Sequence, residues 1–186
     1  MEREEKERER EQEEAYCKTV LYLYPHLSRM AEATKKSVYT QAVLSYRYAG
    51  GTEELAERLI ELRRQSRTLS ETEKEVSEIV SGFSKTEQFV LEYRYFRRKD
   101  RLRRFGESPL PFSLRTFYRR QLSVLARFCG EMRRRGLDGK WFEENFSSMD
   151  WAMTVYKKVL AGKDACLLGK RKKGLDAAKG NVRSAT

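Results

Sequence analysis

Residues 83–135 read FSKTEQFVLEYRYFRRKDRLRRFGESPLPFSLRTFYRRQLSVLARFCGEMRRR, and the rest of the chain is organised around them. Ser84 and Glu87 have the spacing of a capping box, in which each residue satisfies a free backbone N–H of the other. Apolar residues then recur at helical spacing, and they are Phe89, Val90, Tyr93 and Phe96, with Leu91 and Tyr95 beside them. We therefore predict a helix that begins after Ser84.

A second helix is predicted to begin after Ser113, because Phe112 and Phe117 on either side of this cap have the spacing of a hydrophobic staple. At about 100° per residue, positions 113–129 divide into two halves. The apolar half, which we expect to be hidden, holds Leu114, Phe117, Tyr118, Leu122, Val124, Leu125, Phe128 and Cys129, with Gln121 among them. The other half holds Arg115, Thr116, Arg119, Arg120, Ser123 and Arg127.

The charge of the chain is concentrated in this segment. Residues 94–135 carry fourteen arginines and lysines against three acidic residues, a net charge of +11 that equals the formal net charge of the whole chain. A pI near 9.6 with clustered arginine is typical of proteins that bind polyanions. The polar half of helix 113–128 has no acidic residue, so its guanidinium and hydroxyl groups suit guanine edges and phosphates in a major groove. The predicted nucleic-acid-binding residues are Arg97, Arg98, Arg101, Arg104, Arg115, Thr116, Arg119, Arg120, Ser123 and Arg127.

We predict an all-α fold, a helical bundle that contains a helix-turn-helix unit. The expected parts are a charged helical extension at 1–14, a helical support region at 15–82, the DNA-binding unit at 83–137, aromatic helices at 138–161 and a disordered basic tail at 162–186. Within the unit, the arginine-rich segment that follows Phe96 is predicted to be a short helix lying across a phosphate backbone, and GESPLP a turn. The aromatic clusters Trp141, Phe142, Phe146 and Trp151, Val155, Tyr156, Val159, Leu160 are expected to fold back onto the core, with base stacking as the alternative.

Local signals predict where the support helices begin and end. Pro25 should kink or end its helix near Tyr24. The pair at 50–51 is Gly-Gly and should break the chain before a helix that Thr52 caps. Ser70 with Glu73 has capping-box spacing and predicts a further helix start, and Gly82 should close that helix. These helices are expected to pack against the basic unit or against a second copy of the chain.

Several classes of protein are disfavoured. The odd count of three cysteines (Cys17, Cys129, Cys166), widely spaced, argues against a disulfide framework and a zinc knuckle. One histidine, no glycine-rich phosphate loop and no HExxH-like motif predict no enzyme, no cofactor and no metal site, although a metal-dependent nuclease built from dispersed carboxylates stays open. With no signal peptide and no apolar run of about 20 residues, we expect a cytoplasmic protein that does not bind a membrane.

The two motifs of the central unit resemble region four of bacterial sigma factors and the sigma-like phage transcription activators. Glu87, Val90, Leu91, Arg94, Tyr95 and Phe96 match an E-x-x-V-L-x-x-R-Y-F first helix, and Ser113, Arg115, Thr116 and Arg119 match an S-x-R-T-x-x-R recognition-helix start. The resemblance covers about fifty residues and implies a helix-turn-helix that reads duplex DNA. It also implies a transcription regulator that contacts RNA polymerase or another acidic protein. No stretch resembles the sigma region that melts promoters.

The charge pattern leaves two alternatives open. The first is a helical adaptor whose basic surface meets an acidic protein. The second is a protein that binds DNA or RNA without sequence preference, although no usual RNA-binding module is visible. A DNA-binding transcription regulator is the function that the sequence favours.

Overall fold

All regular elements in the described residues are helical, as predicted. The structure, a computed structural model, describes residues 2–45, 51–96 and 112–162. Its α-helices are α1 (Glu2–Val43), α2 (Thr52–Ser81), α3 (Lys85–Leu91), α5 (Leu114–Arg134), α6 (Gly139–Phe146) and α7 (Asp150–Leu160), and a π-helical turn, η2 (Glu92–Phe96), continues α3.

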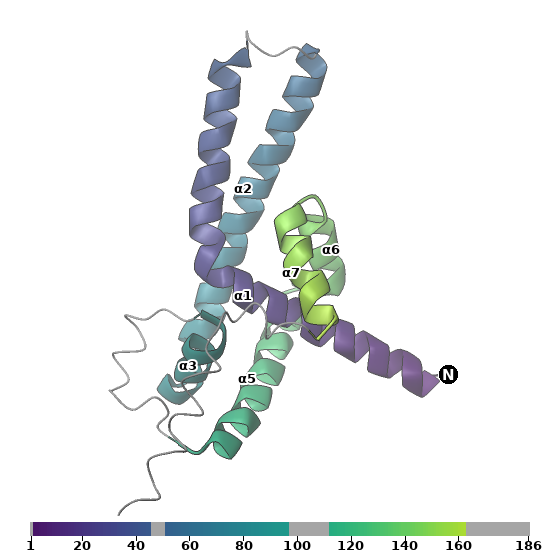
Figure 1. The fold of residues 1–186 in the computed structure, drawn as a ribbon, viewed down its shortest axis with the longest axis vertical. Helices are drawn as coiled ribbons and strands as arrows, with labels where there is room; N and C mark the ends of the chain where they lie inside the picture. The colour runs from purple at the N-terminus through teal and green to yellow at the C-terminus, as the bar shows by residue number, and fades with distance from the viewer. Residues whose placement is uncertain (1, 46–50, 97–111, 163–186) are drawn as a thin grey trace, which may run out of the picture.

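Helix α1 is the central packing element of the fold, and it contacts α2, η2, α5, α6 and α7. Figure 1 shows that it is sharply bent, so that its N-terminal part runs beneath α6 and α7 while the remainder stands beside α2 as an antiparallel pair. Pro25 lies inside this 42-residue helix. A proline removes one i→i−4 hydrogen bond and crowds the preceding turn, which accounts for a bend. The predicted kink is therefore confirmed, and the helix continues past it.

Helix α2 differs from the sequence prediction at two points. Gly51 occupies the cap position without a side-chain hydrogen bond, and Thr52 is the first helical residue. The start predicted at Ser70 is wrong, because α2 is continuous from Thr52 to Ser81. Buried residues on both sides of Ser70 pack α2 into the core. This packing keeps the helix continuous at Ser70, although the Ser70–Glu73 spacing is that of a helix start. Gly82 ends the helix as predicted.

The two cap predictions in the central unit are confirmed. The Glu87 N–H donates to Ser84 Oγ at 3.4 Å, and the Ser84 N–H donates to Glu87 Oε2 at 2.8 Å, which makes a complete capping box. Ser113 accepts from the Thr116 N–H at the start of α5, and the rings of Phe112 and Phe117 stack with centroids 6.2 Å apart. These contacts set the directions in which α3 and α5 leave their turns.

The π-helical turn η2 was not predicted. It buries Glu92, Tyr95 and Phe96 together. The Tyr95 ring meets Tyr22 of α1 with centroids 5.1 Å apart, and Phe96 meets Tyr24 at 4.8 Å. A π turn advances more than four residues per turn, so it turns these side chains toward α1. These ring contacts attach α3 and η2 to α1.

Helix α5 ends at a Schellman motif. The Leu137 N–H donates to the Met132 carbonyl at 2.9 Å and the Gly136 N–H donates to the Arg133 carbonyl at 3.0 Å. Gly136 has φ 73°, in the left-handed region where a side chain is strained. The helix therefore ends here, and the chain leads into α6, whose N-cap is Asp138.

The C-terminal helices fold back onto the core, as predicted. Phe142 and Phe146 of α6 are fully buried and stacked at 4.9 Å, and Phe142 also stacks on Tyr16 of α1 at 6.1 Å. Buried residues of α6 and α7 belong to the same core cluster as those of α1, α2 and α5. Phe142 and Phe146 are thus used in packing, whereas Trp141 is half-buried, and base stacking by the remaining rings stays an untested alternative.

Cys17 and Cys129 are buried free thiols, and burial raises the pKa of the Cys17 thiol. Cys166 and most of the predicted tail, from residue 163 on, lie outside the described residues. None of the helices described here combines the length and apolarity that a membrane span requires.

Candidate nucleic-acid interface

One side of α5 is fixed against the body of the protein. Its buried residues are Phe117, Val124, Leu125, Phe128, Cys129 and Met132. Phe117 meets Tyr93 of η2 with ring centroids 5.4 Å apart, and α3 lies against α5. This packing fixes the rotation of α5 about its axis, so the opposite side of the helix faces away from the core.

The predicted polar half of α5 lies on that outer side. Arg115, Arg119, Arg120 and Ser123 are exposed, and Thr116 is half-buried beside the Ser113 hydroxyl, 3.0 Å away. Among the described residues, Arg115, Arg119 and Arg120 make no ion pair with a carboxylate. The Arg120 guanidinium lies over the Phe112 ring, 4.7 Å from its centroid. Three guanidinium groups thus gather at the N-terminal half of α5, which is also the positive end of the helix dipole.

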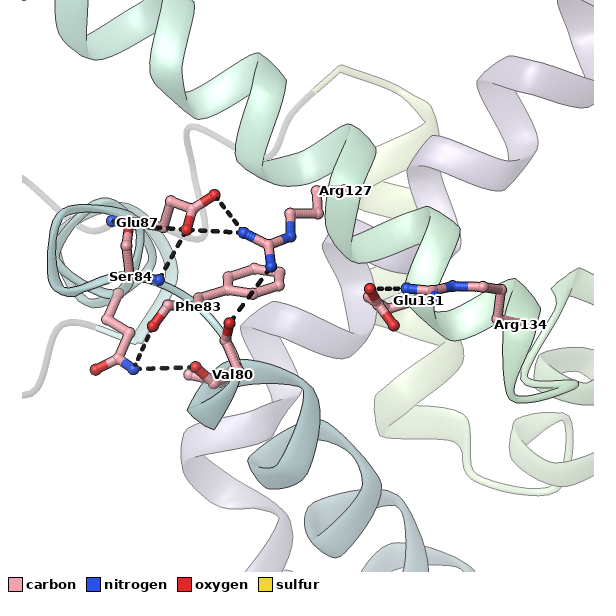
Figure 2. A network of polar contacts seen from close by, with 9 residues as sticks. Val80, Phe83, Ser84, Glu87, Arg127, Glu131 and Arg134 are labelled. Carbon is pink, nitrogen blue, oxygen red and sulfur yellow. Dashed lines mark hydrogen bonds and ion pairs between the residues drawn. The ribbon is translucent and has the colours of Figure 1, made fainter.

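Arg127 has an intramolecular role that the sequence did not indicate. Its Nη1 donates to both carboxylate oxygens of Glu87 at 2.9 Å, and its Nη2 donates to the Gly82 carbonyl at 3.4 Å. Its guanidinium also lies 4.7 Å from the Phe83 ring centroid. Figure 2 shows this side chain reaching from α5 to the turn before α3. Arg127 therefore fastens α5 to α3, and its predicted contact with nucleic acid stays a prediction.

Glu87 is held in its charged form by this arrangement. Burial by itself raises the pKa of the Glu87 carboxyl, but the N–H and hydroxyl of Ser84 and the guanidinium of Arg127 together lower it below its ordinary value. A carboxylate at this position keeps the capping box and the Arg127 contact intact at neutral pH. The network therefore depends on one acidic group that serves both helices.

The arginines at the other end of α5 are also paired with carboxylates. Arg133 bonds Glu13 of α1, and Arg134 bonds Glu131 in its own helix. Arg135 bonds Glu75 and Glu78 of α2 at 2.6 and 2.9 Å. Helix α5 is thus electrostatically divided: carboxylates hold the arginines from Arg127 onward, whereas those of its first two turns project outward.

A cleft of about 290 Å³ separates the start of α3 from α5. Its lining brings hydroxyl groups of both helices close to one guanidinium, and the residues are Ser84, Thr86, Glu87, Val90, Arg120, Ser123 and Val124. Hydroxyl and guanidinium donors suit a phosphate oxygen. The cleft therefore adjoins the basic surface of α5, and the Glu87 carboxylate in its lining is paired with Arg127.

Three residues that were expected to be hidden are exposed. Leu114, Tyr118 and Leu122 show 37%, 54% and 63% of their surface, so their predicted burial is wrong. No neighbouring element among the described residues covers these three side chains, although Phe117 in the same turns is buried. Helical spacing identified the apolar half correctly, but it does not reveal how far the neighbouring elements reach.

The remaining predicted contacts, Arg97, Arg98, Arg101 and Arg104, lie outside the described residues, as does the short helix predicted around them.

Comparison with known proteins finds no family model, no curated protein and no solved structure that matches this chain.

Proposed function

We propose that this protein is a DNA-binding transcription regulator that reads duplex DNA with the N-terminal half of α5. The resemblance to sigma region four motivates the regulatory role. The division of charge along α5 carries the proposal of DNA binding. Carboxylates hold Arg127, Arg133, Arg134 and Arg135, while Arg115 and its neighbours are exposed with no carboxylate partner among the described residues.

The chemistry of this end of α5 suits a major groove. A guanidinium donates two parallel hydrogen bonds to guanine O6 and N7, and recognition helices place their first turns against base edges. Ser123 and the cleft beside α3 offer hydroxyl groups for the phosphate backbone, which fixes the register of a protein on its duplex. Specific and positioning contacts are thus available on adjoining surfaces.

Substitution of the three exposed arginines tests the proposal. Arg115→Ala, Arg119→Ala and Arg120→Ala together should weaken binding to a duplex selected from random DNA by at least about a hundredfold. They should also reduce the salt dependence, by up to about three in the slope of log K against log salt, because each arginine that meets a phosphate releases counterions. Fluorescence anisotropy over a salt series measures both quantities.

The matched control removes three guanidinium groups elsewhere. Arg29, Arg58 and Arg63 are exposed on α1 and α2, and their triple alanine variant should bind nearly as tightly as the wild type. Equal losses for the two triple variants would mean that net charge alone drives binding, as in a protein without sequence preference. No binding of the wild type to duplex DNA at low salt would leave the helical adaptor as the explanation of the basic face.

A further inference from the structure

The first half of α5 displays an apolar stripe that the proposed arginine contacts do not use. Leu114, Tyr118 and Leu122 recur every four residues and are 37%, 54% and 63% exposed. Ala126 is also exposed, one turn beyond Leu122. Residues at this spacing follow one side of a helix, so their side chains form a continuous band.

This band lies against the arginines. At about 100° per residue, Leu122 projects within about 20° of Arg115 and about 60° of Arg119 around the helix axis. Leu122 lies about 10.5 Å from Arg115 and about 4.5 Å from Arg119 along the axis, so a ligand that spans a few base pairs and meets both guanidinium groups also passes Leu122. The surface requires a partner that offers hydrogen-bond acceptors and an apolar group side by side.

We infer that Leu122, flanked by Tyr118 and Ala126, contacts the C5-methyl group of a thymine in the duplex that Arg115 and Arg119 bind. The inference rests on the proposed function. In a major groove, thymine alone among the four bases displays a methyl group, and it stands beside the acceptors of neighbouring guanines. Charge decides against a second copy of this chain as the occupant, because a symmetric contact through this surface would bring the same exposed arginines together.

The helix geometry limits where the thymine lies. Leu122 follows Arg119 by three residues, which is about 4.5 Å along the helix axis. Successive base pairs are about 3.4 Å apart. The thymine that Leu122 contacts should therefore lie within about two base pairs of a guanine that Arg119 reads.

The test uses the full chain and a duplex selected from random DNA. Each thymine of that duplex is replaced in turn by deoxyuridine, which removes only the methyl group. At one or two positions the replacement should weaken wild-type binding about fourfold, the effect of exposing one buried methyl-sized group. Leu122→Ala should lose a similar factor on the thymine duplex and should be insensitive to deoxyuridine at those positions.

Ile60→Ala is the matched control, because Ile60 is 69% exposed on α2 and its variant should keep the full response to deoxyuridine. The inference is overturned if deoxyuridine has no effect at any position, or if Leu122→Ala responds to it as the wild type does. A change of oligomeric mass in Leu122→Ala also overturns it, in favour of self-association. These results leave the proposed function intact, whereas failure of the wild type to bind any duplex removes both. Circular dichroism confirms that each variant is folded.

Discussion

Arg119 and Arg127 are the same residue type, about two turns apart on one helix, with different surroundings. Arg127 joins Glu87, the Gly82 carbonyl and the Phe83 ring, whereas Arg119 is exposed and makes no ion pair with any described carboxylate. A local pattern assigns both to one polar face. Only the fold brings a carboxylate from 40 positions away to one of them.

Arg127→Ala should therefore lower the free energy of unfolding by about 1 kcal/mol, because it removes a partly exposed ion pair and a cation–π contact. Arg119→Ala should leave stability unchanged, since arginine and alanine both favour helices. Urea unfolding followed by circular dichroism measures the difference. Equal stability of the two variants would show that the Arg127 network contributes nothing in solution.

At the scale of elements, α3 depends on one capping box. The Ser84 hydroxyl accepts from the Glu87 N–H and also donates to Glu87 Oε2 at 2.8 Å, which holds the carboxylate that Arg127 binds. Loss of this hydroxyl therefore affects the start of α3 and the contact between α3 and α5 together.

Ser84→Ala should destabilise the protein by about 1 kcal/mol, the usual effect of losing a helix N-cap. Ser77→Ala is the control, because Ser77 is exposed near the C-terminal end of α2, at a helical position where alanine is slightly favourable. Thermal unfolding should give a lower midpoint for the first variant and an unchanged or higher one for the second. Matching midpoints would contradict the role of the cap.

These elements also show what a sequence predicts well. The starts after Ser84 and Ser113 were predictable because a cap and its partner lie within four residues. The start at Ser70 was wrong because the same signal occurs inside a helix that core packing maintains. The π turn at 92–96 was missed because its benefit comes from Tyr22 and Tyr24 of a distant helix.

For the whole molecule, the arrangement of charge was predictable only in part. The excess of arginine in residues 94–135 is visible in the sequence, but its neutralisation by Glu13, Glu75 and Glu78 depends on how α1 and α2 pass beside α5. The candidate site consists of the arginines of α5 that make no ion pair with a carboxylate among the described residues. The sequence therefore identifies the segment that contains such a site. The tertiary contacts of the folded chain determine which arginines of that segment are paired with carboxylates.

Long-range polar contacts also attach the C-terminal helices to α2. Ser148, between α6 and α7, donates to Glu61 and accepts from Arg64 at 3.1 Å, and its carbonyl accepts from Gln65 at 3.2 Å. The hydrogen bonds from Arg64, then those from Ser148 and Gln65, lower the pKa of Glu61 from 4.5 to about 2 despite some burial. Glu61 thus binds its proton less readily in the folded protein than in the unfolded chain.

This shift makes the attachment sensitive to acid. The stability that Glu61 contributes is complete above pH 4.5 and is lost as the pH falls toward about 2, because the unfolded chain takes up the proton first. Glu61→Gln should therefore be less stable than the wild type at neutral pH, and its free energy of unfolding should fall less steeply between these two pH values. Glu57→Gln, an exposed control on the same helix, should follow the wild-type curve. Urea unfolding at a series of pH values measures all three curves, and parallel curves for Glu61→Gln and the wild type would show that the contacts of Glu61 contribute no pH-dependent stability.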